Sequence, residues 1–143
     1  EIAYYAFCSC CSLTSVTIPD SVTKIRGKAF YECSKLTSII IPDSVTYIGC
    51  AFCGCANLTT ITIPANVTCI QDYAFAYCTS LVEVYCKPAL PPYTESYDSC
   101  FGWMAFTENA SGRKIYVPME SVDAYRSAGA WSNYADDIVG CNF

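Results

Sequence analysis

The chain has 143 residues, of which 53% are hydrophobic and 15% are charged, so it can bury the core of one ordinary domain. Its formal net charge of −5 argues against a nucleic-acid partner, because such proteins need a basic face to displace counterions from the phosphates. No apolar stretch approaches the roughly 18 residues of a membrane span, so we expect no direct membrane insertion.

One sequence pattern recurs along the first part of the chain. A segment led by leucine starts at Leu13, Leu36 and Leu58, and a broken copy starts at Leu81, so the spacings are 23, 22 and 23 residues. Self-similarity at a fixed short period is the signature of a repeat protein whose units stack on one another. The spacing therefore predicts a solenoid in which each repeat forms one coil.

Each repeat begins with the pattern of a short strand. In the first copy, Val16 and Ile18 alternate with polar residues, and Pro19 then ends the strand because it has no N–H to donate. The same alternation recurs at Ile39 and Ile41, at Ile61 and Ile63, and at Val84 and Cys86. We therefore expect short parallel strands with one buried face, followed by Val22 and Ile25, which bring the chain back to the core.

The second half of each unit has the pattern Ala-Phe-x-x-Cys-x-x-Leu. It occurs at Ala6–Leu13, Ala29–Leu36, Ala51–Leu58 and Ala74–Leu81. We interpret it as a tight or short helical turn that closes the coil and stacks phenylalanine on phenylalanine. One coil is a residue short, since two residues separate Ile48 from Ala51 whereas three separate Ile25 from Ala29.

The combined motif LxxVxIPxSVTxIxxxAFxxCxx resembles the BspA-type leucine-rich repeat, also called the Treponema pallidum type. The resemblance covers residues 1–88, about three and a half to four units with the first one truncated. It implies a leucine-rich-repeat solenoid, an α/β-type repeat architecture of short parallel strands stacked in a right-handed coil. Proteins of this type are largely bacterial surface or secreted proteins, and several are linked to adhesion to host proteins. The resemblance thus implies an extracellular or cell-surface location.

The chain opens in the middle of a unit. Ile2 to Phe7 align with Ile25 to Phe30 at an offset of 23 residues, with no capping segment before them. The raw end of a solenoid is apolar and adhesive, and natural repeat arrays cover it. We therefore expect further repeats on the N-terminal side of Glu1.

Residues 89–143 are predicted to form a C-terminal capping segment of a strand and a helix. Residues 93–112 have weak periodicity and are interpreted as an irregular, aromatic-rich loop. We expect a strand over Lys114–Pro118 and a helix over Met119–Ala128, with Val122 and Tyr125 on one helix face and Gly129 as the stop. This segment is similar to the closing segment of bacterial surface proteins with these repeats. A ligand site on its Trp131 and Tyr134 is the alternative.

The residue types needed for catalysis are largely missing. The chain has no histidine, which removes the commonest general base and every zinc site that needs imidazole. Its seven glycines are scattered and form no phosphate-binding loop. We expect no enzymatic activity, no catalytic residues, no cofactor and no metal site.

Twelve cysteines are a high count for a chain of this length. Four occupy one column of the repeat, at Cys10, Cys33, Cys55 and Cys78, and Cys86 takes an inward strand position. We interpret these as free, buried thiols, with disulfides between neighbouring coils as the alternative. Cys50-x-x-Cys53 has the spacing of a redox or metal motif, although the two residues also bracket the Ala-Phe of a repeat turn.

The outward strand residues align across the coils into rows that are candidates for partner binding. These residues are Ser15, Ser38, Thr60 and Glu83 in one row and Thr17, Ile40, Thr62 and Tyr85 in the next. A second outward row is expected at Thr23, Thr46 and Thr68, beside a row at Lys24, Tyr47 and Cys69. Ile40, Tyr47 and Tyr85 are the candidate anchors, because exposed apolar and aromatic groups dominate binding energy at interfaces. A plain soluble strand face is the alternative.

The sequence as a whole therefore predicts a non-enzymatic protein–protein interaction or adhesion module of a bacterial cell-surface or secreted protein. Its partner would be another protein, for example a host or matrix protein. The competing interpretation is a structural spacer or display repeat of a larger protein whose function lies elsewhere.

Overall fold

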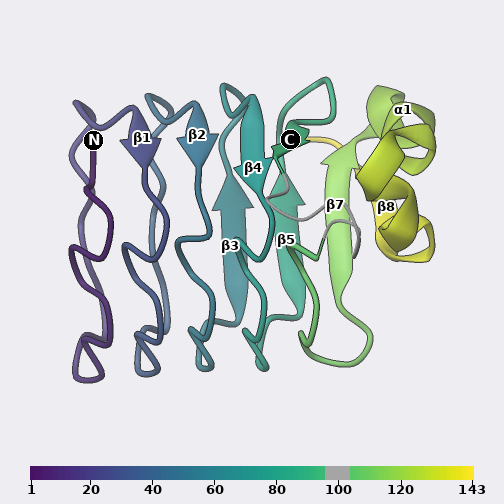
Figure 1. The fold of residues 1–143 in the computed structure, drawn as a ribbon. Coiled ribbons are helices and arrows are strands. Elements are labelled where there is room, and N and C mark those ends of the chain that lie inside the picture. Colours follow the sequence, from purple (N-terminus) through teal and green to yellow (C-terminus); the bar gives the residue numbers. More distant parts are fainter. Residues whose placement is uncertain (96–103) are drawn as a thin grey trace.

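The computed structural model describes residues 1–95 and 104–143. The chain winds as a row of stacked coils that runs from the N-terminus to a helical segment at the opposite end (Figure 1). The predicted solenoid of short parallel strands is confirmed, because the six strand pairs among the described residues are all parallel.

The strands form two sheets. The first sheet has the order β3 (Thr60–Ile63), β5 (Glu83–Cys86), β7 (Lys114–Pro118) and β8 (Ile138–Cys141). The second has the order β1 (Lys24–Ile25), β2 (Tyr47–Ile48), β4 (Cys69–Gln71) and β6 (Tyr93–Glu95). The second sheet was not predicted, because two- and three-residue strands are too short to show a period of two.

The first two coils pair less extensively than expected. The predicted strands around Thr17 and Ile40 are reduced to one isolated parallel bridge between these two residues. Their inward side chains still pack as predicted, with Ile18, Ile39 and Ile41 buried in the core. The repeat therefore fixes which side chains point inward even where the backbone pairing is sparse.

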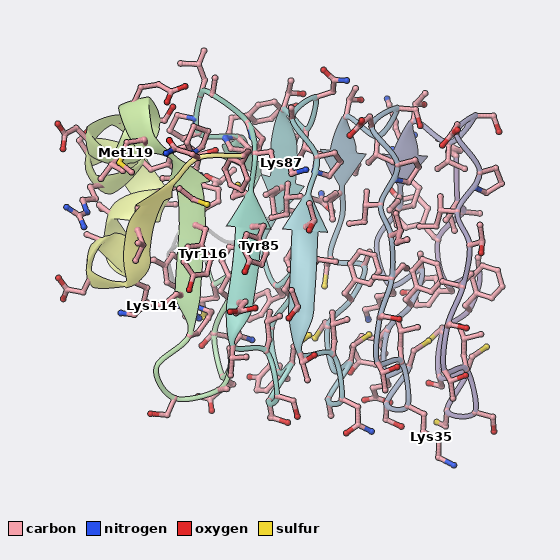
Figure 2. The ribbon with its side chains drawn as sticks, turned by 180° about the vertical axis from the view of Figure 1, so that it is seen from behind. Lys35, Tyr85, Lys87, Lys114, Tyr116 and Met119 are labelled. Carbon is pink, nitrogen blue, oxygen red and sulfur yellow. The ribbon has the colours of Figure 1, made fainter. Side chains whose placement is uncertain are left out.

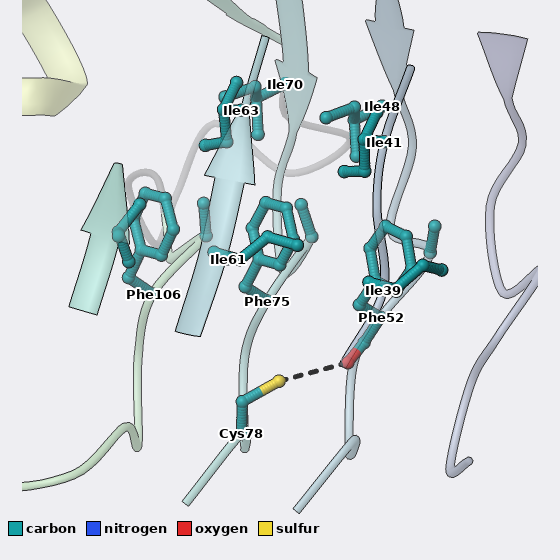
Figure 3. Close-up of a cluster of buried hydrophobic side chains, with 14 of the residues drawn as sticks. Ile39, Ile41, Ile48, Phe52, Ile61, Ile63, Ile70, Phe75, Cys78 and Phe106 are labelled. Carbon is teal, nitrogen blue, oxygen red and sulfur yellow. Dashed lines mark hydrogen bonds between the residues drawn. The ribbon is translucent and has the colours of Figure 1, made fainter. Parts of the chain in front are cut away.

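A ladder of phenylalanine rings runs the length of the core. Phe7, Phe30, Phe52, Phe75 and Phe106 stack in sequence with ring centroids 5.2, 5.3, 5.4 and 5.4 Å apart. Neighbouring rings are inclined by 3–5° only, so they form offset stacks of nearly parallel rings. Figure 3 shows Phe52, Phe75 and Phe106 of this ladder beside the isoleucines of the same core.

The repeated cysteines serve as buried hydrogen-bond donors. The Sγ atoms of Cys33, Cys55 and Cys78 donate to the carbonyl oxygens of Phe7, Phe30 and Phe52 at 3.1, 3.2 and 3.2 Å. Figure 3 draws the last of these bonds. Burial raises the pKa of Cys78 to about 12, so its thiol keeps its proton and remains a donor.

The prediction of free, buried thiols holds for most of this column. Cys33, Cys55, Cys78 and Cys86 are buried free thiols. It is wrong for Cys10, which is exposed because its coil has a neighbour on one side only within the described residues.

The prediction of an irregular loop over residues 93–112 is wrong for the described part of that range. Tyr93 opens β6, and Ala105 and Phe106 continue the repeat turn and the ring ladder. Asn109 replaces the expected cysteine and donates its Nδ2 hydrogen to the carbonyl oxygen of Phe75 at 2.9 Å. The sequence concealed this coil because its cysteine is replaced; Cys100, Phe101 and Trp103 of the predicted loop lie outside the described residues.

The predicted strand over Lys114–Pro118 is confirmed as β7. The predicted helix is present in two parts, the 3₁₀ turn η1 (Met119–Ser121) and the helix α1 (Val122–Ser127), and a longer 3₁₀ segment, η2 (Gly129–Asp137), follows. The helix ends at Ser127 with Ala128 as its C-cap, two residues before the predicted stop at Gly129, and Gly129 begins the next segment.

The helical segment is tied to the preceding coil by buried polar atoms. The Tyr125 hydroxyl donates to the carbonyl oxygen of Pro88 at 2.8 Å, and Trp131 Nε1 donates to that of Pro92 at 2.9 Å. Trp131 is 1% exposed and packs against Phe106. This burial favours a capping role for Trp131 over a ligand site, while the division of the chain at residue 88 stays a prediction.

Candidate protein-binding surface

The outer face of the first sheet carries most of the predicted partner-binding residues. Strand register places Thr60, Glu83 and Lys114 in one row, and Thr62, Tyr85, Tyr116 and Val139 in the next. Thr17 and Ile40 hold the position of the second row in the first two coils, where they are bridged to each other. We call the residues of these two rows, together with Ser15 and Ser38, the outer sheet face.

Two tyrosine rings stack at the centre of this face. The Tyr85 and Tyr116 ring centroids lie 4.9 Å apart with an interplanar angle of 15°. Both side chains project from β5 and β7 on the side of the sheet shown in Figure 2. Both side chains are half-buried, and we call this stacked pair of rings the tyrosine platform.

The electrostatics of the platform keep its first tyrosine neutral. Desolvation by the surrounding atoms raises the pKa of Tyr85 above its ordinary value, and the adjacent Glu83 carboxylate adds to this shift. The Tyr85 hydroxyl keeps its proton at physiological pH, as an unshifted tyrosine also does, and can act as a hydrogen-bond donor. Glu83 and Lys114, which are register neighbours, place opposite charges beside the rings.

Ile40 is the most exposed large apolar side chain described for the chain, at 82%. Solvent exposure of a single isoleucine is ordinary, but this one lies on the same face as the tyrosine platform. Around it the face is lined by the small hydroxyl residues Ser15, Thr17 and Ser38, all exposed. The face therefore combines apolar anchors with small polar side chains around them.

The structure separates Tyr47 from the other candidate residues. Tyr47 lies in β2 of the second sheet, where its register neighbours are Lys24 and Cys69. The Arg26 guanidinium lies 5.8 Å from the ring centroids of both Tyr47 and Tyr4. Eight of the nine predicted residues thus share one face, and the ninth belongs to a cation–π cluster elsewhere.

The predicted outward row at Lys24, Tyr47 and Cys69 is wrong in one position. Cys69 is 1% exposed, whereas Lys24 is exposed and Tyr47 is half-buried. The second sheet pairs Cys69 with both Tyr47 and Tyr93, so strands cover it on both sides.

Sequence reasoning missed three residues of the outer sheet face: Lys114, Tyr116 and Val139. They were assigned to a separate cap, and so were not aligned with the repeats. The sequence does indicate that these residues continue the repeat strands, because Ile115 and Val117 alternate with Lys114 and Tyr116 as in the earlier strands.

The described residues offer no assembled site for a metal: residues 1–95 and 104–143 contain no group of three or more Cys, Asp or Glu side chains that could hold an ion. Over the same residues, no helix has the length and apolar character needed to cross a membrane.

Comparisons with known proteins agree with this architecture. The family model of the BspA type leucine rich repeat region matches residues 1–121 in six copies. Among solved structures, the crystal structure of the T. pallidum leucine rich repeat protein is similar in fold, with a TM-score of 0.56 and 21% sequence identity. That similarity covers 95% of this chain and 75% of the other. No curated protein matches the sequence. The chain belongs to the BspA-type leucine-rich repeat family.

Proposed function

We propose that this chain is an adhesion module that binds a protein partner through the outer sheet face and is displayed at the cell surface or secreted. Repeat modules of this family are of the protein-interaction type. The adhesive role, the extracellular setting and a host or matrix protein as partner are parts of the proposal. One observation carries it: the stacked Tyr85 and Tyr116 rings lie on the same face as the exposed Ile40.

Physical chemistry favours this face over the rest of the surface. Tyrosines supply large, rigid contact area at low cost in side-chain entropy, which is why they are enriched among residues that dominate binding energy. The two rings already stack on one another, so little further ordering is needed when a partner covers them. Ile40 offers apolar area, and Glu83 with Lys114 can fix the orientation of a partner by charge.

The test measures binding of the purified chain to a panel of purified extracellular-matrix proteins. For any member that binds, Tyr85→Ala should weaken the affinity about 30-fold, which corresponds to roughly 2 kcal/mol for a central aromatic anchor. Tyr47→Ala is the matched control, because it removes the same side chain from the other sheet, and it should change the affinity by less than about twofold.

Equal losses in the two variants would contradict the assigned face. Binding to no member of the panel would contradict the matrix partner and favour the structural-spacer interpretation.

A further inference from the structure

Cys50 and Cys53 flank the turn of the one shortened coil. The repeat itself requires only the third thiol of this segment, Cys55, which donates to the carbonyl oxygen of Phe30 at 3.2 Å. The positions of Cys50 and Cys53 are filled by Lys28 and Tyr31 in the preceding coil. Packing of the solenoid therefore does not explain why this turn carries two additional thiols.

A cavity of about 280 Å³ lies over the shortened coil. Its walls include Tyr4, Tyr5, Lys28 and Tyr73, and the Cys50 side chain lines it as well. These walls come from four successive coils, and Cys50 belongs to the one that lacks a residue. Two residues separate Ile48 from Ala51 where the neighbouring coils have three, so the turn of this coil is recessed between Lys28 and Tyr73.

Gly49 shows how tightly the shortened turn is drawn against its neighbour. A Cβ atom at this position would lie 2.7 Å from the backbone nitrogen of Gly27 and 2.9 Å from the carbonyl carbon of Arg26. Such contacts are too short for any residue with a side chain. Glycine therefore permits the close approach that holds Cys50 within the cavity wall.

The two thiols differ in access and in charge. Cys50 is partly exposed to the cavity, whereas Cys53 is 8% exposed. The Cys50 thiol donates to the carbonyl oxygen of Tyr73 at 3.7 Å. A hydrogen bond with Cys53, helped by the Lys28 ammonium group, lowers the pKa of Cys50, while partial burial and the Asp72 carboxylate oppose this shift. The same hydrogen bond and burial raise the pKa of Cys53. The pair thus consists of an accessible thiol inclined to ionise and a buried thiol that keeps its proton.

We propose that Cys50 and Cys53 form a redox-active dithiol that reduces a low-molecular-weight disulfide bound in this cavity. In the first step, the Cys50 thiolate attacks one sulfur of the disulfide RS–SR, forms a Cys50–S–S–R bond and releases RS⁻. In the second, the RS⁻ released in the first step takes the proton of the Cys53 thiol, and the Cys53 thiolate attacks the Cys50 sulfur, which releases the second RS⁻. Two electrons leave the protein dithiol, and the two released thiolates take up the two protons.

The cavity suits this reaction for two reasons. The accessible sulfur faces a mostly apolar, aromatic-walled recess that can hold the organic part of a small disulfide. Lys28 at the wall stabilises both the attacking thiolate and the thiolate that leaves. This inference is independent of the proposed adhesion role, because the outer sheet face lies on the other sheet.

The test treats the fully reduced protein with glutathione disulfide, blocks the remaining thiols by alkylation and then digests the unfolded chain with chymotrypsin. Cleavage after Phe52 separates Cys50 from Cys53, so a disulfide between them is detected as two fragments that remain joined until reduced. We expect these joined fragments in the wild type, and we expect Cys50 to react about tenfold faster than the partly exposed Cys8.

Two variants distinguish the dithiol from random oxidation. Cys53→Ser lacks the resolving thiol, so the reaction should stop at a mixed disulfide between Cys50 and glutathione. Cys50→Ser should leave Cys53 unmodified, because Cys53 is buried. Cys8→Ser, the matched control in the first coil, should form the joined fragments at the wild-type rate.

A pH profile tests the positioning role of Lys28. Lys28→Gln should slow the reaction of Cys50 near neutral pH by up to about tenfold and shift its pH profile upward, because the stabilising charge is removed. Lys24→Gln, which removes an equal charge that does not line the cavity, should leave the profile unchanged.

The proposal is overturned if Cys50 reacts no faster than Cys8, or if Cys53→Ser fails to accumulate the mixed disulfide.

Discussion

At the scale of single residues, the residue two places after each ladder phenylalanine lies in the left-handed backbone region, and three coils hold a second such residue, at Tyr5, Lys28 and Tyr73. Ser9, Glu32, Tyr77 and Glu108 have φ values of 53–58°, and Gly54 occupies the equivalent position with φ 80°. Each non-glycine residue there costs roughly 1–2 kcal/mol, because its Cβ crowds the following carbonyl oxygen. The chain thus carries a repeated local strain that its stacked core must offset.

Replacing one of these residues with glycine should relieve the strain. Glu32→Gly is expected to raise the free energy of unfolding by about 0.5–1 kcal/mol. The backbone strain that glycine removes is larger than the entropic cost of ordering the more flexible glycine on folding. Urea unfolding measures this change. Glu32→Ala is the matched control, because it removes the same side chain but keeps the left-handed cost, and it should give no such gain.

A loss of stability in Glu32→Gly would show that the Glu32 side chain contributes more than its backbone costs.

At the scale of elements, the sequence specifies the buried columns better than the strands. The leucine, isoleucine and phenylalanine columns were predictable because every coil repeats them at the same positions. The second sheet was not predictable from the sequence, because β1 and β2 have two residues each. Such short strands form only when the register between neighbouring coils brings them side by side. The Asn109 coil was hidden because an amide replaces a thiol while making the same bond to a phenylalanine carbonyl.

The ring ladder is the element whose loss should cost most. Phe52→Ala removes a fully buried ring that stacks on both Phe30 and Phe75, so the free energy of unfolding should fall by about 3–5 kcal/mol. Phe7→Ala provides the control, because Phe7 is 37% exposed and has one ring neighbour. The fall in the free energy of unfolding should be less than half as large for Phe7→Ala as for Phe52→Ala, as measured by urea unfolding. Equal falls in the two variants would contradict the claim that stability depends on stacking from both sides of a ring.

At the scale of the whole molecule, the fold is a quasi-one-dimensional stack in which each coil contacts its neighbours. This arrangement lines up equivalent outward positions into a continuous face, while the shortened coil interrupts the turns with a cavity. Eight of the nine candidate binding residues were predicted on that face because strand alternation assigns them outward. Tyr116 was missed because the repeat was taken to end before β7. Tyr47, which was expected in a separate outward row, lies in the second sheet.

The central claim is that the outer sheet face binds the protein partner, and tyrosine footprinting of the complex tests it most directly. A matrix protein that binds in the panel is added, the complex is exposed to hydroxyl radicals, and oxidation at each tyrosine is compared with that of the free chain. We predict that Tyr85 and Tyr116 become protected while Tyr47 and Tyr4 stay as reactive as before. Protection of Tyr47 and Tyr4 with unchanged oxidation of Tyr85 and Tyr116 would contradict the claim.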